Sequence, residues 1–258
     1  MSTLLDHPLL FFPLVAALLF LAGATGVWLK STRADTVSAA SDSLKTLEGT
    51  VLGLLGLLLG FSFAMGVSRY DTRKQLEVDE ANAIGTTWLR TDTLEAPARG
   101  LERQVLKDYV RARMDFFSAG TDASALQKSL AETSDLQNQL WATGANYAST
   151  HRDPVTALFL SSLNDTIDDA EKRTAALENR IPIAAWVLLL FISASASGLV
   201  GIGMSKRSRP LLIVLPLVVG AAMALILDLD SPRSGFVVVH QKSMERVAEQ
   251  MNAPVVLP

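Results

Sequence analysis

The chain has 258 residues, 49% of them hydrophobic and 19% charged, and its mean hydropathy of +0.29 is high for a soluble protein. The net charge of −3 argues against a general attraction to nucleic acid. The absence of cysteine excludes disulfides, thiolate nucleophiles and thiolate metal sites.

Four apolar blocks are each long enough to form a membrane-spanning helix, because about 20 residues at a rise of about 1.5 Å cross a hydrocarbon core of about 30 Å. They lie in two pairs on either side of a long polar stretch, which indicates a membrane protein. No Lys or Arg precedes the first block, so we interpret it as a span and not as a cleaved signal peptide. The expected spans are residues 8–29, 49–67, 182–204 and 211–227.

Residues 68–181, between the second and third spans, are expected to form a helical bundle outside the membrane. Apolar residues recur at three- and four-residue spacing from Leu101 to Phe116, which is the pattern of an amphipathic helix. Neither Pro nor Gly interrupts the chain just after the second span, so that helix is expected to continue to about Arg90, with a turn at Pro97. The sequence therefore predicts an all-α fold. Its expected parts are a transmembrane hairpin at 1–67, the extramembrane helical domain at 68–181, a second hairpin at 182–229 and a tail with a short helix at 230–258.

The distribution of basic residues predicts an orientation. The short loop 205–210 contains three basic residues and no acid, and three more follow the first span. The positive-inside rule therefore places both short loops in the cytoplasm, and it places both termini and the domain at 68–181 outside, in a bacterial inner (plasma) membrane.

The second span carries two candidate surfaces. Glycines at intervals of four, three and four residues let helix backbones approach closely in lipid, which favours packing against a neighbouring helix; a helix that lines a pore or moves during gating is the alternative. A hydrophobic stripe on the same helix either forms a dewetting constriction in a channel or faces lipid or a partner helix. The glycines are Gly49, Gly53, Gly56 and Gly60, and the stripe is Leu54, Leu58, Phe61 and Met65.

Hydroxyl groups mark the third span. Ser193, Ser197 and Gly201 follow one another at four-residue steps. The spacing favours hydrogen bonds between helices over a watery path through the membrane.

Asp228 and Asp230 stand where the fourth span leaves the membrane. We expect them to cap backbone amides or to pair with Arg233. A hard cation such as Ca²⁺ is the alternative, although two carboxylates fall short of the roughly six to eight oxygens that it takes. These two aspartates are the only, and weak, candidates for metal ligands.

Enzyme motifs are missing from the sequence. It contains no phosphate-binding glycine loop with a lysine, no HExxH string and no recognisable Ser/His/Asp arrangement. No catalytic residue and no cofactor are therefore predicted.

Four strings carry a resemblance to a known family: FSFA at 61–64, RYD at 69–71, EANAIGT at 80–86 and DLDSPRSG at 228–235. They resemble the bestrophin-like domain family of mostly bacterial membrane proteins. The motif positions that the resemblance identifies are Arg69, Tyr70, Asp71, Glu80, Asn82, Gly85, Asp228, Asp230, Pro232 and Gly235.

The resemblance implies remote kinship with bestrophins, which are pentameric anion channels. It implies an oligomeric, channel-like protein whose partners are the lipid bilayer, further copies of the chain and inorganic ions. It also implies a cytosolic domain between the two hairpins, whereas the charge count places that domain outside. The two orientations therefore remain alternatives.

The leading hypothesis is a ring of subunits in which the span at 49–67 lies nearest the axis, because one subunit with four spans is too small to enclose a pore. The competing hypothesis is a membrane-anchored sensor or scaffold whose helical domain binds a protein partner.

Overall fold

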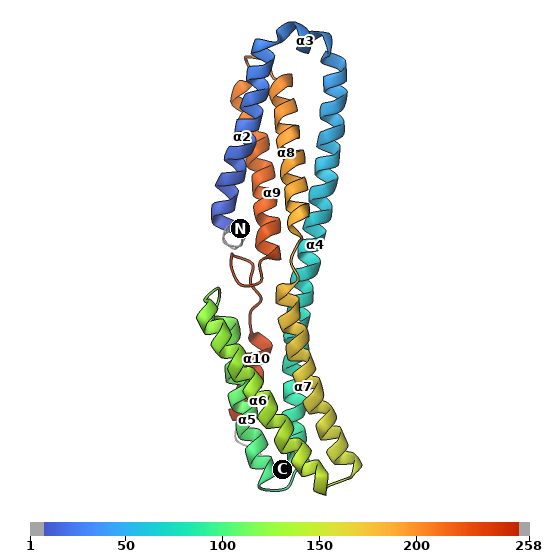
Figure 1. Cartoon of the computed structure of the whole chain (residues 1–258), viewed down its shortest axis with the longest axis vertical. Helices are drawn as coiled ribbons and strands as arrows, with labels where there is room; N and C mark the ends of the chain where they lie inside the picture. The colour runs from blue at the N-terminus through green and yellow to red at the C-terminus, as the bar shows by residue number, and fades with distance from the viewer. Residues whose placement is uncertain (1–7, 253–258) are drawn as a thin grey trace. The chain divides into compact units, whose positions relative to one another are not determined.

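The computed structural model describes residues 8–252, and within this range the chain forms helices and no strand. The predicted all-α class is confirmed. The elements are α2 (Pro8–Thr32), α3 (Ala34–Ala39), α4 (Ser41–Arg90), η1 (Thr91–Thr93), α5 (Ala98–Ser118), α6 (Ala123–Thr150), α7 (Pro154–Glu178), α8 (Ile183–Gly203), η2 (Arg209–Ile213), α9 (Val214–Asp230) and α10 (Lys242–Asn252), shown in Figure 1.

Four segments are long and apolar enough to cross a membrane, as the sequence predicts. They are Leu9–Thr32, Ser41–Thr93, Pro154–Gly203 and Arg209–Asp230. The expected continuation of the second span is also confirmed, because α4 runs unbroken for 50 residues.

Contacts between Cα atoms divide the chain into two compact units. Unit 1 consists of the described residues of Met1–Tyr70 and Arg180–Val238, and unit 2 consists of those of Asp71–Asn179 and Val239–Pro258. Leu9–Thr32 and Arg209–Asp230 lie wholly in unit 1, whereas Ser41–Thr93 and Pro154–Gly203 each have one part in unit 1 and one in unit 2. Residues 239–252 belong with the helices of unit 2.

Unit 1 is held together by a close crossing of α2 and α8. A Cβ atom on Gly26 would lie 2.1 Å from the carbonyl oxygen of Gly198, and one on Gly201 would lie 2.1 Å from that of Gly23. Small residues allow this approach, and van der Waals contact is what associates helices where lipid surrounds them. The hydroxyl of Ser197 donates a hydrogen bond of 2.6 Å to the carbonyl oxygen of Leu19, so the expected bond between helices is confirmed for this serine.

Apolar side chains complete the core of unit 1 around this crossing. The rings of Phe11 and Trp186 meet edge to face with centroids 5.6 Å apart, and both are buried. Helix α9 adds Met223, and α4 adds Leu55.

Unit 2 is a bundle of α5, α6, α7, α10 and the last part of α4. Two of its helices begin at aspartates that cap them. The carboxylate of Asp122 accepts backbone N–H bonds at the start of α6, and that of Asp153 does so at the start of α7. Helix α10 is capped from a distance, because Glu77 accepts from the backbone amides of Ser243 (2.7 Å) and Met244 (3.1 Å).

The apolar face of α10 explains its place in the bundle. Met244, Val247 and Met251 are buried in the same core as Ile84 of α4 and Leu106 of α5. These three residues stand at three- and four-residue spacing and so lie on one side of a helix.

Candidate functional site

The part of α4 within unit 1 is the most exposed of the four apolar stretches. Only 17% of its most apolar window is buried in the chain, against 33–39% for the other three. Leu55, Ser62 and Gly66 are buried, and their spacing of seven and four residues places them on one side of the helix. The remaining sides of this stretch have few neighbours within the chain.

The glycines singled out in this stretch lie on an open side. A Cβ atom built on Gly49, Gly53, Gly56 or Gly60 would meet no atom of the described chain within 4 Å. Packing at these glycines therefore needs a partner from outside the described residues of this chain.

The hydrophobic stripe divides into two environments. Leu54, Phe61 and Met65 are exposed, whereas Leu58 is half-buried against the core of unit 1. Leu57, which the stripe did not include, is 54% exposed, and Phe61 is 63% exposed. Leu57 could have been predicted from the sequence, because it precedes Phe61 by four residues. Both residues therefore lie on the side of α4 that faces away from Leu55.

The two aspartates at the end of α9 accept hydrogen bonds from backbone amides of other segments of the chain. Asp228 accepts hydrogen bonds from the backbone amides of Phe236 (2.8 Å) and Val237 (3.0 Å). Both carboxylate oxygens of Asp230 lie within 3.1 Å of the backbone nitrogen of Ile181, which starts the segment leading into α8. These contacts are caps of the kind expected for these two side chains.

Asp230 also lies close to two arginines from distant parts of the chain, of which Arg69 is a motif position. Its carboxylate lies 3.9 Å from Nε of Arg69 and 3.8 Å from Nε of Arg180, and Arg180 donates a 3.2 Å bond to the hydroxyl of Ser231. Among residues 8–252, no group of three or more His, Cys, Asp or Glu is placed to hold a metal ion. The arrangement is a buried carboxylate between two guanidinium groups.

The other motif positions near these aspartates have simpler surroundings. Tyr70 and Pro232 are half-buried, and Asp71 is exposed. Gly235 has a φ of 102°, a backbone conformation that other residues rarely adopt, so a glycine is required where the chain turns back toward Asp228.

Glu80 is at the centre of a buried charged cluster in unit 2. Its Oε1 is 2.5 Å from Nε of Arg113, its Oε2 is 2.6 Å from Nη1 of Arg173, and none of the three side chains is more than 2% exposed. Arg173 also donates a hydrogen bond to Gln241, just before α10, and lies 3.5 Å from the ring centroid of Phe117. Burial lowers the pKa of Arg173, and the nearby carboxylate of Glu80 opposes this change.

Sequence reasoning identified Glu80 through its motif but missed both arginines. Arg113 stands between Tyr109 and Phe116 at the three- and four-residue spacing of the buried side of α5. A charge at such a position is the signal that could have indicated a buried ion pair.

The remaining motif positions of α4 are Asn82 and Gly85, which have different neighbours. A Cβ atom on Gly85 would lie 3.7 Å from Val247 of α10, which is ordinary contact. Asn82 is exposed and lines an open groove between α4 and α7.

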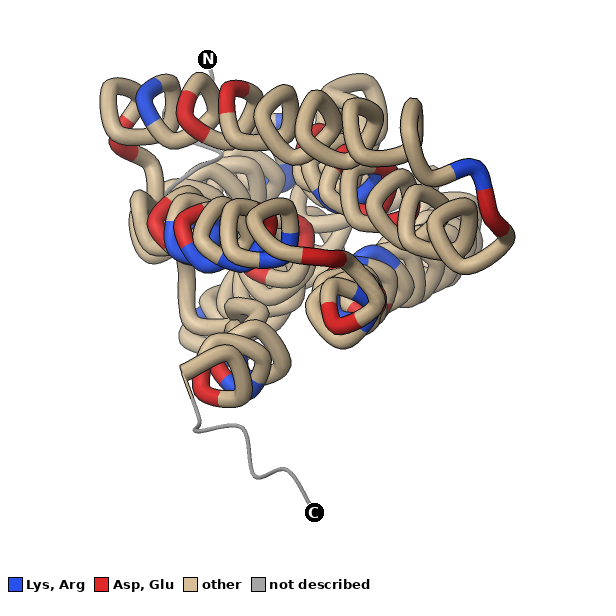
Figure 2. The backbone as a smooth tube through the Cα atoms, turned by 90° about the horizontal axis from the view of Figure 1, so that it is seen from below, with Lys and Arg blue, Asp and Glu red and all other residues tan. Residues whose placement is uncertain are grey.

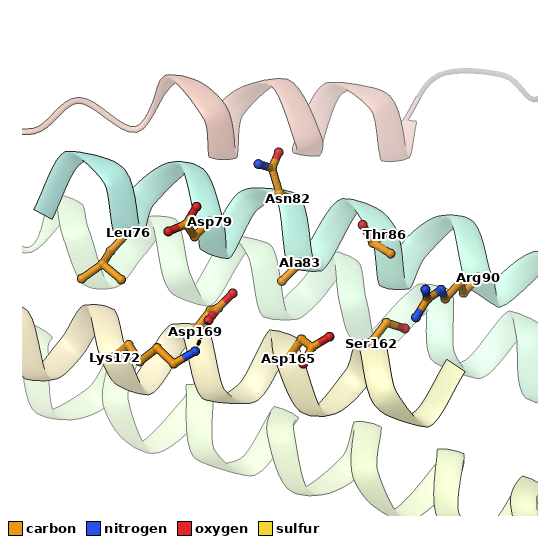
Figure 3. Close-up of a pocket in the computed structure, with 10 residues that line it drawn as sticks. All are labelled: Leu76, Asp79, Asn82, Ala83, Thr86, Arg90, Ser162, Asp165, Asp169 and Lys172. Atoms are coloured by element: carbon orange, nitrogen blue, oxygen red, sulfur yellow. Dashed lines mark hydrogen bonds and ion pairs between the residues drawn. The ribbon is translucent and has the colours of Figure 1, made fainter. Parts of the chain in front are cut away.

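This groove has a volume of about 370 Å³, and Figure 3 shows the side chains of the two helices lining it. Asp79 and Thr86 come from α4, and Asp165 and Asp169 come from α7. Lys172 forms a 2.8 Å ion pair with Asp169 on the same helix. The groove is thus polar and carries charges of both signs.

Glu102 of α5 is a second buried acid, and it has different surroundings. Its side chain is fully buried, and neither carboxylate oxygen has a hydrogen-bond partner among the described residues. Burial raises the pKa of Glu102 to about 8. The side chain therefore holds a proton at neutral pH.

Comparison with known proteins identifies similarities in sequence and in fold. The family model described as Bestrophin-like domain matches residues 17–244. None of the curated proteins matches the chain significantly.

Solved structures share the fold over nearly the whole chain. A bacterial Bestrophin homolog from Klebsiella pneumoniae with the mutation L177T superposes with a TM-score of 0.69 at 12% identity, covering 94% of this chain and 99% of the other. The structure of the homolog from Klebsiella pneumoniae solved by Zn-SAD phasing gives 0.67 at 12% identity, covering 92% and 96%. A structure described as a membrane protein G264A gives 0.68 at 12% identity, covering 92% and 96%.

Proposed function

The chain belongs to the Bestrophin-like domain family, and we propose that it is one subunit of an oligomeric, channel-like membrane protein that conducts ions. The observation that carries this proposal is the exposed part of α4 in unit 1. This stretch is long and apolar enough to span a membrane, yet only 17% of its most apolar window is buried.

A ring of subunits accounts for both exposed sides of this helix. The four glycines let the helix of a neighbouring copy approach, since no atom of the described chain covers them. Leu57 and Phe61 then face the axis, where large apolar side chains can close a pore by excluding water. In the proposed ring, Leu54 and Met65 border this constriction and Leu58 supports it from the core side.

The proposed arrangement in the membrane is two hairpins with the helical domain between them. The spans are the apolar parts of α2, α4, α8 and the segment from η2 to α9. The short basic loops lie on the cytoplasmic side of a bacterial inner membrane in this proposal, because basic residues near spans are retained there. Reporter fusions within 205–210 and after residue 252 test it: activity of an externally active reporter in the short loop reverses the orientation and gives the cytosolic domain that kinship with bestrophins implies.

The decisive experiment joins a mass measurement to a conductance measurement. The protein is purified in detergent, the mass of the complex is determined, and the same preparation is fused into planar bilayers. A ring of defined stoichiometry that passes ions supports the proposal. A monomer or dimer that is silent in bilayers contradicts it.

Ion selectivity is measured in the same bilayers from reversal potentials in asymmetric KCl. Kinship with bestrophin anion channels leads us to expect a preference for Cl⁻ over K⁺. A reversal potential near that of K⁺ would contradict anion selectivity while leaving the channel itself supported.

A membrane-anchored scaffold is the second candidate function. The open groove between α4 and α7 favours it, because a polar groove of about 370 Å³ offers a protein partner a place to bind. A silent monomer that retains a defined protein partner through unit 2 would support this alternative.

A further inference from the structure

Unit 2 carries two charged surfaces of opposite sign on different helices. The first is the outward side of α7 beside the groove, where four acids and one base occur between residues 165 and 172. Asp165 and Asp169 line the groove itself, and Asp79 of α4 adds a further acid from the other wall, as Figure 3 shows. Arg90 and Lys172 also line the groove, so its three acids leave a small net negative charge. We call these lining residues the acidic groove.

The second surface is a row of cations on α5. Arg99, Arg103, Lys107 and Arg111 follow one another at steps of four residues, so they lie along one side of the helix. Arg103 and Lys107 both lie over the ring of Trp88, at 4.8 and 5.6 Å from its centroid. We call these four residues the basic row, and Figure 2 shows basic and acidic segments along the helices of unit 2.

Contacts within the chain hold the basic row in place without neutralising it. Arg103 forms a 2.7 Å ion pair with Asp92, and Arg111 forms a 3.1 Å pair with Asp108. Asp92 is exposed, and Asp108 is half-buried but pairs with the exposed Arg111, so both pairs are solvated and weak. The row keeps an excess of positive charge in a fixed geometry, which reduces the entropy lost on binding.

One end of the acidic groove is apolar. Val155 and Leu158 are exposed, and they stand on the same side of α7 as Ser162, which lines the groove. The guanidinium of Arg90 donates a 2.6 Å bond to the carbonyl oxygen of Leu158 and links this end to α4. An apolar patch beside charged residues is a common composition of a protein interface.

We propose that the basic row of one copy of this chain docks against the acidic groove of the next copy. The occupant is a second copy because the same chain presents both complementary surfaces. The contact joins two different surfaces, so it is head-to-tail, and such contacts close into rings when the rotation between copies allows it. This inference rests on the proposed ring and adds a contact that sets its register, because complementary charges favour one arrangement of the two surfaces over others.

Charge reversal tests the contact. One variant combines Asp165→Lys with Asp169→Lys in the groove, and another combines Lys107→Glu with Arg111→Glu in the row. We expect each variant to raise the concentration needed for half-assembly by at least about ten-fold, measured by mass photometry across a dilution series. The combined four-residue variant has complementary charges again between the changed positions, and it is expected to recover assembly.

A matched control reverses charge elsewhere in unit 2. Glu132→Lys with Asp135→Lys changes two exposed acids of α6 and is expected to leave assembly unchanged. Helix content and thermal unfolding of every variant, measured by circular dichroism, separate a lost contact from a lost fold. Assembly that none of the reversals alters, or that the combined variant fails to recover with its helix content intact, overturns the inference.

Introduced cysteines give a second, direct measurement, because the chain has no cysteine of its own. Chains with Arg111→Cys and Asp165→Cys together, or Lys107→Cys and Asp169→Cys together, are oxidised and separated without reductant. A head-to-tail contact gives a ladder of linked copies only when both positions are changed. Dimers from a single changed position would show a symmetric contact and overturn the inference.

The experiments distinguish failure of the contact from failure of the proposed function. A wild-type protein that is monomeric at every concentration overturns the ring and, with it, this contact. A wild-type ring that conducts ions but resists the reversals and gives no ladder overturns the contact alone.

Discussion

The two parts of α4 contrast within one unbroken helix. In unit 2 the helix is engaged on its inward side: Ala81 and Ile84 are buried, Glu77 caps α10, and Glu80 pairs with two arginines. In unit 1 its glycines meet nothing within 4 Å of the described chain, and Phe61 is exposed. The contrast teaches that one part of α4 serves the fold of the chain, while the other part is left open to surroundings that the described chain does not supply.

The largest expected effect concerns Glu80. Replacing it by Gln leaves two buried guanidinium groups without the carboxylate between them, and breaking a buried ion pair costs about 3–5 kcal/mol. We expect Glu80→Gln to lower the free energy of unfolding of unit 2 by this amount, measured by denaturant titration in detergent. Asp71→Asn, an exposed change on the same helix, should have almost no effect. A Glu80→Gln protein as stable as the wild type would contradict the role of Glu80 in stabilising unit 2.

The next largest effect depends on pH. Burial raises the pKa of Glu102 from its ordinary 4.5 to about 8, so the folded state keeps a proton that the unfolded state releases. The stability associated with this proton is present below pH 4.5 and is lost as the pH rises from 4.5 to about 8, with a loss of about 3–4 kcal/mol between pH 5 and pH 8. In the Glu102→Gln protein, this loss of stability with rising pH should be absent, because Gln has no proton to release.

Unfolding free energies at pH 5 and pH 8 measure this difference. The wild type should lose more stability than Glu102→Gln between the two values. The exposed acid Glu132, changed to Gln, is the control and should follow the wild type. Equal pH dependence of wild type and Glu102→Gln would show that Glu102 is not kept protonated by burial.

A smaller effect separates two kinds of glycine. A side chain at Gly26 must displace the backbone at Gly198, since even a Cβ would lie 2.1 Å from its carbonyl oxygen, and such overpacking costs about 1–3 kcal/mol. We expect Gly26→Leu to lower the unfolding temperature of the subunit. Gly53→Leu should leave the subunit stable but weaken assembly by about ten-fold. Thermal unfolding and complex mass measure the two outcomes, and a Gly53→Leu protein that assembles like the wild type would remove the proposed role of these glycines.

The smallest expected effect lies at the proposed constriction. Phe61→Ser makes the narrow part of the pore easier to wet, so we expect single-channel conductance or open probability to rise by about ten-fold, a change of about 1.4 kcal/mol in the barrier. Leu58→Ser, on the half-buried side of the same helix, is the control. Its current should change less than that of Phe61→Ser, and the reverse order would place the pore on another side of α4.

The apolar periodicity of the chain was enough to predict the helices and their spans. The four apolar blocks, the continuation of α4 and the bond made by Ser197 all follow from residue type and spacing, which depend on local geometry and on the cost of leaving backbone groups unpaired in lipid. The family, too, was recognisable from strings such as EANAIGT, and the match over residues 17–244 confirms it.

Which glycines meet another helix was decided only by the tertiary structure. The regular glycines at 49–60 attracted attention in the sequence, but the close crossing uses Gly26 and Gly198, whose spacing is less conspicuous. Periodicity indicates the side of a helix on which a small residue lies and carries no information about which helix, if any, faces it.

The buried charges also separate what the sequence predicts from what only the tertiary structure decides. Sequence alone indicated Glu80 as a motif residue, whereas its pairing with Arg113 and Arg173 joins residues 33 and 93 positions away. The sequence determined the helices, their apolar sides and the charges they carry, because these depend on neighbours along the chain. The partners of those charges and the open side of α4 depend on how distant helices pack, and only the folded chain decides that.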